Sequence, residues 1–283
     1  MTRDSEGPPD ELRAFAIQNF GAGQAWFSLS GGRSNRSWRL VTADGSWVFK
    51  LFDSGRSNSL FPNDPTAEIT ALEALSGTRL APDFQASFAT GCGLCLVYRY
   101  VTGTPLTCTD AETIRTLAKL HDVPAPKLRC IEATPAALLQ EGRKFLEGLA
   151  TERAEELLRH LPKPKDIPSG PGVFLHGDPV PANVLAQGEH RRLIDWQCPA
   201  LGDASADLAI ALSPAMHVVY GAGTLTPAEE LIALQAYPDT SVIERYLSLK
   251  PFYHWRMAAY CAWKVAQGET IYDAAFEAEF NRI

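Results

Sequence analysis

Cysteine is scarce in this 283-residue chain, which holds only six, scattered along its length. That scarcity excludes the class of small secreted domains held together by disulfides. Long apolar runs are missing as well, since no stretch reaches the ~20 residues that cross a bilayer. The first residues also lack the cationic start and apolar stretch of a secretory signal. Cations are outnumbered, because 26 lysines and arginines face 33 aspartates and glutamates, for a formal net charge of −7. A nucleic-acid-binding protein needs the opposite excess. We therefore expect a soluble cytoplasmic protein that binds neither nucleic acid nor a membrane.

A zinc or redox site built from cysteines is not predicted either. Cys92-Gly93-Leu94-Cys95 has the C-x-x-C spacing, but no second pair follows at a zinc-ligand spacing. A redox motif would precede a helix, whereas a strand pattern follows here. We interpret these cysteines as ordinary buried or turn thiols.

The proportions of hydrophobic and charged residues favour a folded protein with a substantial core. Hydrophobic residues make up 46% of the chain and charged residues 21%, outside the range typical of disorder. The length suits one large domain or two lobes. The pattern changes near residue 102, from strands with one helix to mainly helices, so we expect two lobes.

The first hundred residues predict a short helix, a β-hairpin, a second helix and a further strand. The first helix covers 11–20, where apolar residues recur at helical spacing. The hairpin joins apolar runs at 38–41 and 47–52 through Asp44-Gly45, a strong turn signal. Asp64-Pro65 reads as an N-cap followed by proline at the first helical position, so the second helix should run to about residue 76. Residues 94–98 predict the further strand. Beyond them helical patterns dominate, with breaks at 124–126 and 162–172.

The segment with the clearest chemistry lies in the second half of the chain. An apolar run at 173–175 leads into His176-Gly177-Asp178, Asn183 follows five residues later, and a second apolar run ends in Asp195. An amide and a carboxylate supply the hard oxygen ligands that Mg²⁺ prefers while it keeps water and substrate ligands. The remaining carboxylate, Asp178, can orient an attacking hydroxyl and accept its proton. Phosphoryl transfer needs these parts, because it depends mainly on positioning and charge neutralisation.

The pattern H-G-D-x-x-x-x-N followed by I-D-W resembles the aminoglycoside phosphotransferase and choline kinase superfamily, which has a protein-kinase-like fold. Other segments are similar to that superfamily in the same order along the chain. They are the loop at 29–38, Lys50 at a strand end, the helix at 68–75, the segment at 96–103, the helix at 117–121, and Gly202-Asp203 with Ala206-Asp207-Leu208-Ala209. The resemblance implies an α+β, two-lobed fold. Residues 1–100 would form a nucleotide-binding lobe with a small antiparallel sheet, and residues 101–283 a helical lobe with the catalytic loop and the acceptor site.

The resemblance also implies a role for each matching residue. Asp178 would be the catalytic base, and Asn183 and Asp195 would hold Mg²⁺ on the phosphates of ATP. Lys50 would contact the α- and β-phosphates and pair with Glu68. We prefer Glu68 to Glu73 because leucines follow it at the family spacing. The nucleotide would further be held by the loop residues Gly31, Gly32, Ser34 and Asn35, and by backbone groups of Arg99, Tyr100 and Val101 at the adenine edge. Asp207 and His176 would brace the catalytic loop.

Departures from the protein-kinase pattern favour a small-molecule kinase. The loop at 29–38 is not G-x-G-x-x-G, Val180 stands in place of the catalytic-loop lysine, Trp196-Gln197 replaces Phe-Gly, and no Ala-Pro-Glu segment follows. A catalytically silent, nucleotide-binding pseudokinase is a further alternative, but every residue that the chemistry requires is present.

The resemblance implies that the acceptor is a small molecule with a hydroxyl group. The loop at 29–38 most resembles the choline and thiamine kinases, so an amino alcohol such as choline or ethanolamine, or a thiamine-like alcohol, is the first expectation. An aminoglycoside or a sugar is the alternative. The acidic net charge is compatible with a cationic acceptor. Trp255, Ala259 and Trp263 recur every four residues and form either plain core or a face that binds an ammonium group.

Overall fold

The computed structural model describes residues 7–22, 25–29, 34–52 and 57–283. The chain divides into two compact units, Met1–Thr102 and Gly103–Ile283. The first unit is built on an antiparallel sheet and the second mainly on helices, so the expected α+β class is confirmed. None of the helices within the described ranges has the length and apolarity needed to cross a bilayer.

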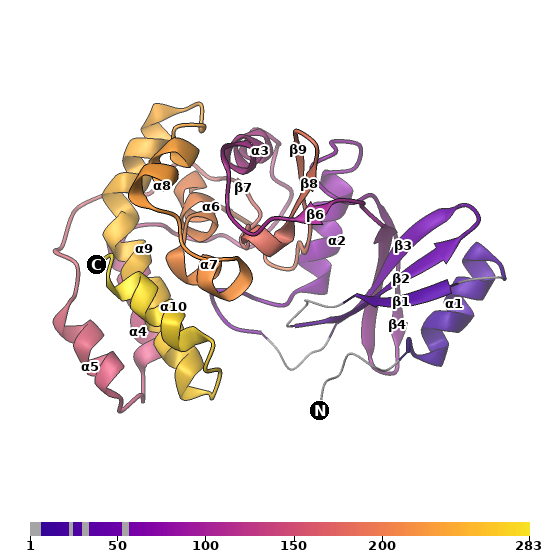
Figure 1. Cartoon of the computed structure of the whole chain (residues 1–283), viewed down its shortest axis with the longest axis horizontal. Helices are drawn as coiled ribbons and strands as arrows, with labels where there is room; N and C mark the ends of the chain where they lie inside the picture. Colours follow the sequence, from indigo (N-terminus) through magenta and orange to yellow (C-terminus); the bar gives the residue numbers. More distant parts are fainter. Residues whose placement is uncertain (1–6, 23–24, 30–33, 53–56) are drawn as a thin grey trace. The chain divides into compact units, whose positions relative to one another are not determined.

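Five antiparallel strands form the sheet of the first unit, in the order β1-β2-β3-β5-β4 (Figure 1). Their bounds are Ala25–Leu29 (β1), Arg36–Thr42 (β2), Gly45–Leu51 (β3), Phe84–Thr90 (β4) and Gly93–Arg99 (β5). The predicted hairpin is present, because β2 and β3 pair from Arg36 opposite Leu51 to Thr42 opposite Gly45. Gly45 has φ +139°, a conformation that glycine adopts without strain.

One face of this sheet carries the core of the first unit. Trp38 and Leu40 on β2 and Phe49 on β3 are buried there. The helix α1 (Asp10–Phe20), close to the predicted 11–20, adds Leu12 and Ala16 to the same cluster. Side chains alternate between the two faces of a strand, so the neighbours of Phe49 on β3, Val48 and Lys50, point to the opposite face.

The helix α2 (Pro65–Ala74) begins as the sequence predicts. The Asp64 carboxylate accepts hydrogen bonds from the backbone N–H groups of Thr66 and Ala67, at 2.9 and 3.0 Å. Such a cap satisfies N–H groups that have no partner within the helix. The helix ends two residues earlier than the predicted residue 76.

The second unit is organised around one long helix, α9 (Thr240–Ala266). The helices α4 (Pro135–Leu146), α6 (Ala204–Ala211) and α10 (Tyr272–Phe280) pack against it (Figure 1). The other helices are α3 (Ala111–His121), α5 (Glu152–Arg159), α7 (Pro214–Tyr220) and α8 (Pro227–Leu234). The predicted breaks at 124–126 and 162–172 are irregular segments.

Short strands in the second unit frame the segment of interest. β7 (Val173–Leu175) pairs with β10 (Ala200–Gly202), and β8 (Val184–Gln187) lies between β6 (Thr104–Pro105) and β9 (His190–Leu193). A single turn of 3₁₀ helix, η2 (Pro181–Asn183), immediately precedes β8. The chain between β7 and β8 is thereby fixed at both ends by strand pairing.

Candidate active site

In the first unit, Lys50 and Glu68 form a buried ion pair. Lys50 lies on β3 and Glu68 on α2, and their side chains are 4% and 1% exposed. The Lys50 ammonium lies 2.5 Å from a Glu68 carboxylate oxygen and 4.9 Å from the centre of the Phe52 ring. Glu73, the rival partner in the sequence, is exposed. The pair holds an ammonium group at a fixed position on the sheet face opposite the core.

Asn35 is tied to the loop that precedes α2. Its amide exchanges two hydrogen bonds with the amide of Asn63, at 2.8 and 3.0 Å, while Asn63 N–H donates to Ser57 at 3.1 Å. Ser34 is half-buried beside it. Gly31 and Gly32 lie outside the described residues.

The three residues expected at the adenine edge differ in what their backbone offers. The N–H of Arg99 donates to the Asp83 carbonyl at 2.8 Å, and the N–H of Tyr100 to the Ser46 carbonyl at 2.9 Å. Within the described part of the chain, the N–H of Val101 has no such partner. Of the three, the Val101 N–H is therefore the donor left for a ligand.

In the second unit, β7 leads directly into the loop that carries Asp178. The Asn183 side-chain nitrogen donates to the Asp178 backbone carbonyl at 3.0 Å and to its carboxylate at 3.2 Å. Asp178 is 9% exposed. Because the amide nitrogen of Asn183 is engaged with Asp178, its amide oxygen is the atom that remains for a cation.

Asp195 is brought beside Asn183 by the backbone. The N–H of Ile194 donates to the Asn183 carbonyl at 2.9 Å, and the Ile194 carbonyl lies 3.0 Å from Nε2 of His176. His176 Nδ1 in turn accepts the Asp178 N–H at 3.2 Å. Asp195 has φ +64°, a left-handed conformation that aspartate tolerates better than most side chains. Asp178, Asn183 and Asp195 are thus joined through His176 and one backbone hydrogen bond.

Asp207 on α6 braces this loop, as the sequence suggested. Its fully buried carboxylate accepts the backbone N–H groups of His176 and Gly177, at 2.9 and 2.8 Å. Gly177 has φ +81°, and a Cβ there would lie 2.1 Å from the Cys198 carbonyl oxygen. Only glycine can therefore occupy that position without moving the loop.

A match to a known family accompanies this geometry. The sequence profile of the phosphotransferase enzyme family matches residues 28–246. The chain belongs to this family. As its members are, it is a phosphotransferase with an alcohol group as acceptor.

The similar proteins act on different acceptors. Streptomycin 3''-kinase from Streptomyces griseus is 27% identical, over 82% of this chain and 93% of that protein. A choline/ethanolamine kinase family protein from Mesorhizobium loti has a TM-score of 0.66 at 17% identity, covering 96% of this chain and 92% of its own. Choline kinase from Cryptosporidium parvum has a TM-score of 0.67 at 14% identity, covering 96% and 94%. These structures establish the protein-kinase-like fold that the resemblance implied.

The donor set of this phosphotransferase fits magnesium better than a metal held by protein alone. Within the described ranges, no three His, Cys, Asp or Glu side chains gather closely enough to form a metal site. Asn183 and Asp195 offer one amide oxygen and one carboxylate. Mg²⁺ is usually bound in this way, by one or two protein oxygens together with water and substrate phosphates.

The aromatic stripe of α9 is largely core. Trp255 is fully buried and its indole N–H donates to the Leu157 carbonyl at 2.9 Å. Trp263, Tyr260 and Tyr272 surround an ammonium group that the chain itself supplies, because Nζ of Lys264 lies 5.5–5.9 Å from the three ring centres. The ammonium group of Lys264 is therefore the cation that contacts these three rings in the structure.

The sequence analysis did not identify two residues that support Asp207, namely His121 and Tyr237. Nε2 of His121 lies 3.2 Å from the Asp207 carboxylate, and Nδ1 lies 2.9 Å from the Tyr237 hydroxyl. Burial raises the pKa of Tyr237 well above its usual range, so its hydroxyl keeps its proton. The available signal was the match of 117–121 to the superfamily, which ends at His121.

Proposed function

We propose that this phosphotransferase is a magnesium-dependent kinase that moves the γ-phosphoryl group of ATP to a hydroxyl of a small cationic metabolite. The observation that carries the proposal is the contact of Asn183 with Asp178. In that contact the Asn183 amide nitrogen donates to the Asp178 carboxylate, and the bond from the Ile194 N–H to the Asn183 carbonyl holds the residue before Asp195 next to Asn183. These are the oxygen groups that the reaction requires at one place.

Asp178 is assigned the role of catalytic base. The amide of Asn183 donates to the Asp178 carboxylate and holds it in one orientation, and a carboxylate held in this way can accept the proton of an acceptor hydroxyl. As the hydroxyl oxygen attacks the γ-phosphorus, its proton passes to Asp178 and the bond to the β-phosphate oxygen breaks, so that ADP leaves. The fixed carboxylate therefore orients the nucleophile as well as accepting its proton.

Asn183 and Asp195 are the residues that would hold magnesium. When bound, the metal neutralises charge on the transferring phosphate. Lys50 would contact the α- and β-phosphates, since its ion pair with Glu68 keeps the ammonium in place. Gly31, Gly32, Ser34 and Asn35 would form the phosphate loop.

The adenine edge is assigned to the segment Arg99 to Val101, with Val101 N–H as the donor, because the N–H groups of Arg99 and Tyr100 are engaged within the first unit. Residues 1–100 would then bind the nucleotide together with the Val101 N–H, and the rest of 101–283 would supply the base, the metal ligands and the acceptor site. Use of ATP is supported by two solved structures of similar fold, a spectinomycin phosphotransferase in complex with ADP and spectinomycin and an aminoglycoside phosphotransferase in complex with AMP-PNP and hygromycin B. An ATP-dependent kinase works where ATP is plentiful, so we place this one in the cytoplasm.

Two acceptor classes are supported by different observations. The 27% identity to streptomycin 3''-kinase supports an aminoglycoside. The TM-scores to choline kinases, with the choline-kinase-like loop at 29–38, support an amino alcohol. Lys264 already occupies the rings of Trp263 and its neighbours, which weighs against that stripe as the ammonium site.

The test is a panel assay. Purified protein with ATP and Mg²⁺ is given streptomycin, spectinomycin, hygromycin B, choline, ethanolamine, thiamine and simple sugars, one at a time. We expect ADP release with at least one acceptor and a product that carries one extra phosphoryl group by mass spectrometry. Nucleotide binding without transfer to any acceptor would instead support the silent pseudokinase.

A further inference from the structure

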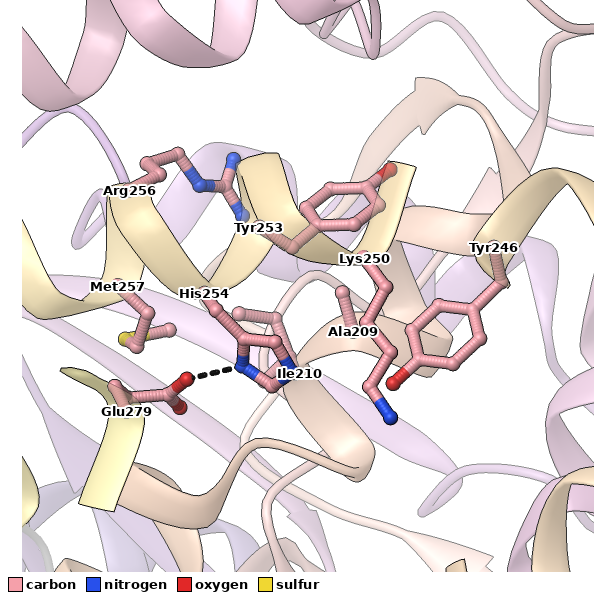
Figure 2. Close-up of a pocket in the computed structure, with 9 residues that line it drawn as sticks. All are labelled: Ala209, Ile210, Tyr246, Lys250, Tyr253, His254, Arg256, Met257 and Glu279. Carbon is pink, nitrogen blue, oxygen red and sulfur yellow. Dashed lines mark hydrogen bonds and ion pairs between the residues drawn. The ribbon is translucent and has the colours of Figure 1, made fainter. Parts of the chain in front are cut away.

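A buried carboxylate on the C-terminal helix α10, that of Glu279, contacts the N-terminus of α7. Glu279, which is 0% exposed, accepts hydrogen bonds from the Ser213 hydroxyl and from the Ala215 N–H, the latter at 3.1 Å. Its second oxygen lies 2.5 Å from Nδ1 of His254. Figure 2 shows this pair, joined by a dashed line, among the residues that line a small pocket formed by α6, α9 and α10.

These contacts complete the capping of α7. Pro214 at the first helical position has no N–H to satisfy. The next two N–H groups are bonded, that of Ala215 to Glu279 and that of Met216 to the hydroxyl of Ser213, the N-cap residue. Glu279 also places a negative group at the helix end that carries the positive partial charge. The start of α7 is thus fixed by a residue 64 positions away in the sequence.

A second contact fixes the body of α7. The buried ring of His217 lies with Nδ1 2.8 Å from the Ser213 carbonyl, and its Nε2 accepts the Thr109 N–H at 3.1 Å. Helix α7 packs against η2, the turn that ends at Asn183. A shift of α7 is therefore transmitted to η2 by direct packing.

We propose that Glu279 is a positioning residue for phosphoryl transfer: by fixing α7 it holds η2, and with it the amide of Asn183. This inference rests on the proposed function, because it assumes that Asn183 is a magnesium ligand. Glu279 itself touches no reacting atom; it acts through Ser213 and Ala215.

The test compares Glu279→Gln with Glu230→Gln. Glu230 is a matched control, since it is also buried (6% exposed) and also bridges helices of this unit, accepting from Tyr246 at 3.2 Å and from Lys250. Its hydrogen-bond and ion-pair partners are Tyr246 and Lys250 on α9 and Arg282, so it acts on α7 only through its charge near His217. Ser213→Ala breaks the Glu279 contact from the other side and serves as the second variant should Glu279→Gln not fold.

Two readouts are measured in the full chain. In steady-state kinetics, Glu279→Gln and Ser213→Ala should raise the Mg²⁺ concentration for half-maximal rate about tenfold, the size usual when the support of a metal ligand is lost. The KM for ATP at saturating Mg²⁺ should stay unchanged. In hydrogen–deuterium exchange, both variants should speed exchange in the peptide 182–187, and Glu230→Gln should do neither.

Some outcomes overturn the positioning role. They are an unchanged Mg²⁺ requirement and unchanged exchange at 182–187 in a folded Glu279→Gln protein, or equal effects in Glu230→Gln. Absence of transfer in the unsubstituted protein would overturn the proposed function instead, and the exchange measurement would still decide whether Glu279 holds η2.

Discussion

Replacing Asp207 by alanine tests the brace beneath the catalytic loop. The carboxylate is fully buried and accepts the backbone N–H groups of His176 and Gly177, and it lies 3.2 Å from the His121 ring nitrogen. Each buried donor left without an acceptor costs about 1–3 kcal/mol, so the two backbone N–H groups alone predict a loss of about 2–6 kcal/mol. Turnover should fall with it, because those N–H groups fix the residues next to Asp178.

The assay is urea unfolding followed by tryptophan fluorescence, with the free energy of unfolding taken from linear extrapolation. Asp239→Ala is the control: Asp239 caps α9 with its side chain in solvent, so its removal should cost far less. Asp207→Asn keeps one oxygen acceptor and should fall between the two. A loss below about 1 kcal/mol for Asp207→Ala would refute the reasoning, since one unsatisfied buried donor already exceeds it.

Three further predictions concern Gly177, the Lys50–Glu68 pair and His217. Gly177→Ala should lower the melting temperature far more than Gly188→Ala, because both have positive φ but only the Cβ at Gly177 meets another atom; equal losses would contradict this. Lys50→Met should cost about 3–5 kcal/mol by removing one partner of a buried ion pair, and the double variant Lys50→Met/Glu68→Leu should regain most of that loss in urea unfolding. Burial lowers the pKa of His217 below 6.5. Below pH 6.5 the His217 side chain therefore takes up a proton in the unfolded chain while it stays neutral in the folded chain. The free energy of unfolding should decrease as the pH is lowered below 6.5, and this contribution should stay constant above pH 6.5. His217→Gln should remove that part of the slope, and an identical slope would contradict it.

Turn and cap residues in the sequence predicted much of the secondary structure of the first unit. Asp44-Gly45 between two apolar runs fixed the hairpin, and Asp64-Pro65 marked the start of α2, because each feature depends on residues within one turn. The loop of Asp178 and Asn183 was also visible, since its spacing is set along one short segment. The place of Asp195 beside Asn183 was predicted only through the family resemblance, because it depends on a hairpin closing at 184–193 and on a left-handed backbone at Asp195 itself.

Long-range polar contacts account for what the sequence did not reveal. The partners of Glu279 lie 25 to 66 residues away, and no spacing rule connects them. Pro251 ordinarily ends a helix, yet α9 continues through it to Ala266, since packing of its faces against α4, α6 and α10 stabilises the whole length. Tertiary packing outweighs local preference at such places.

The measurement that tests the central claim most directly is the rate of ADP release by Asp178→Ala, with the acceptor identified in the panel and saturating ATP and Mg²⁺. A general base contributes about 10²–10⁴-fold to the rate, so turnover should fall by at least a hundredfold while the Kd for ATP, measured by calorimetry, stays within about twofold of the unsubstituted value. Turnover within a few-fold of the unsubstituted protein would contradict the role assigned to Asp178, and with it the proposed mechanism.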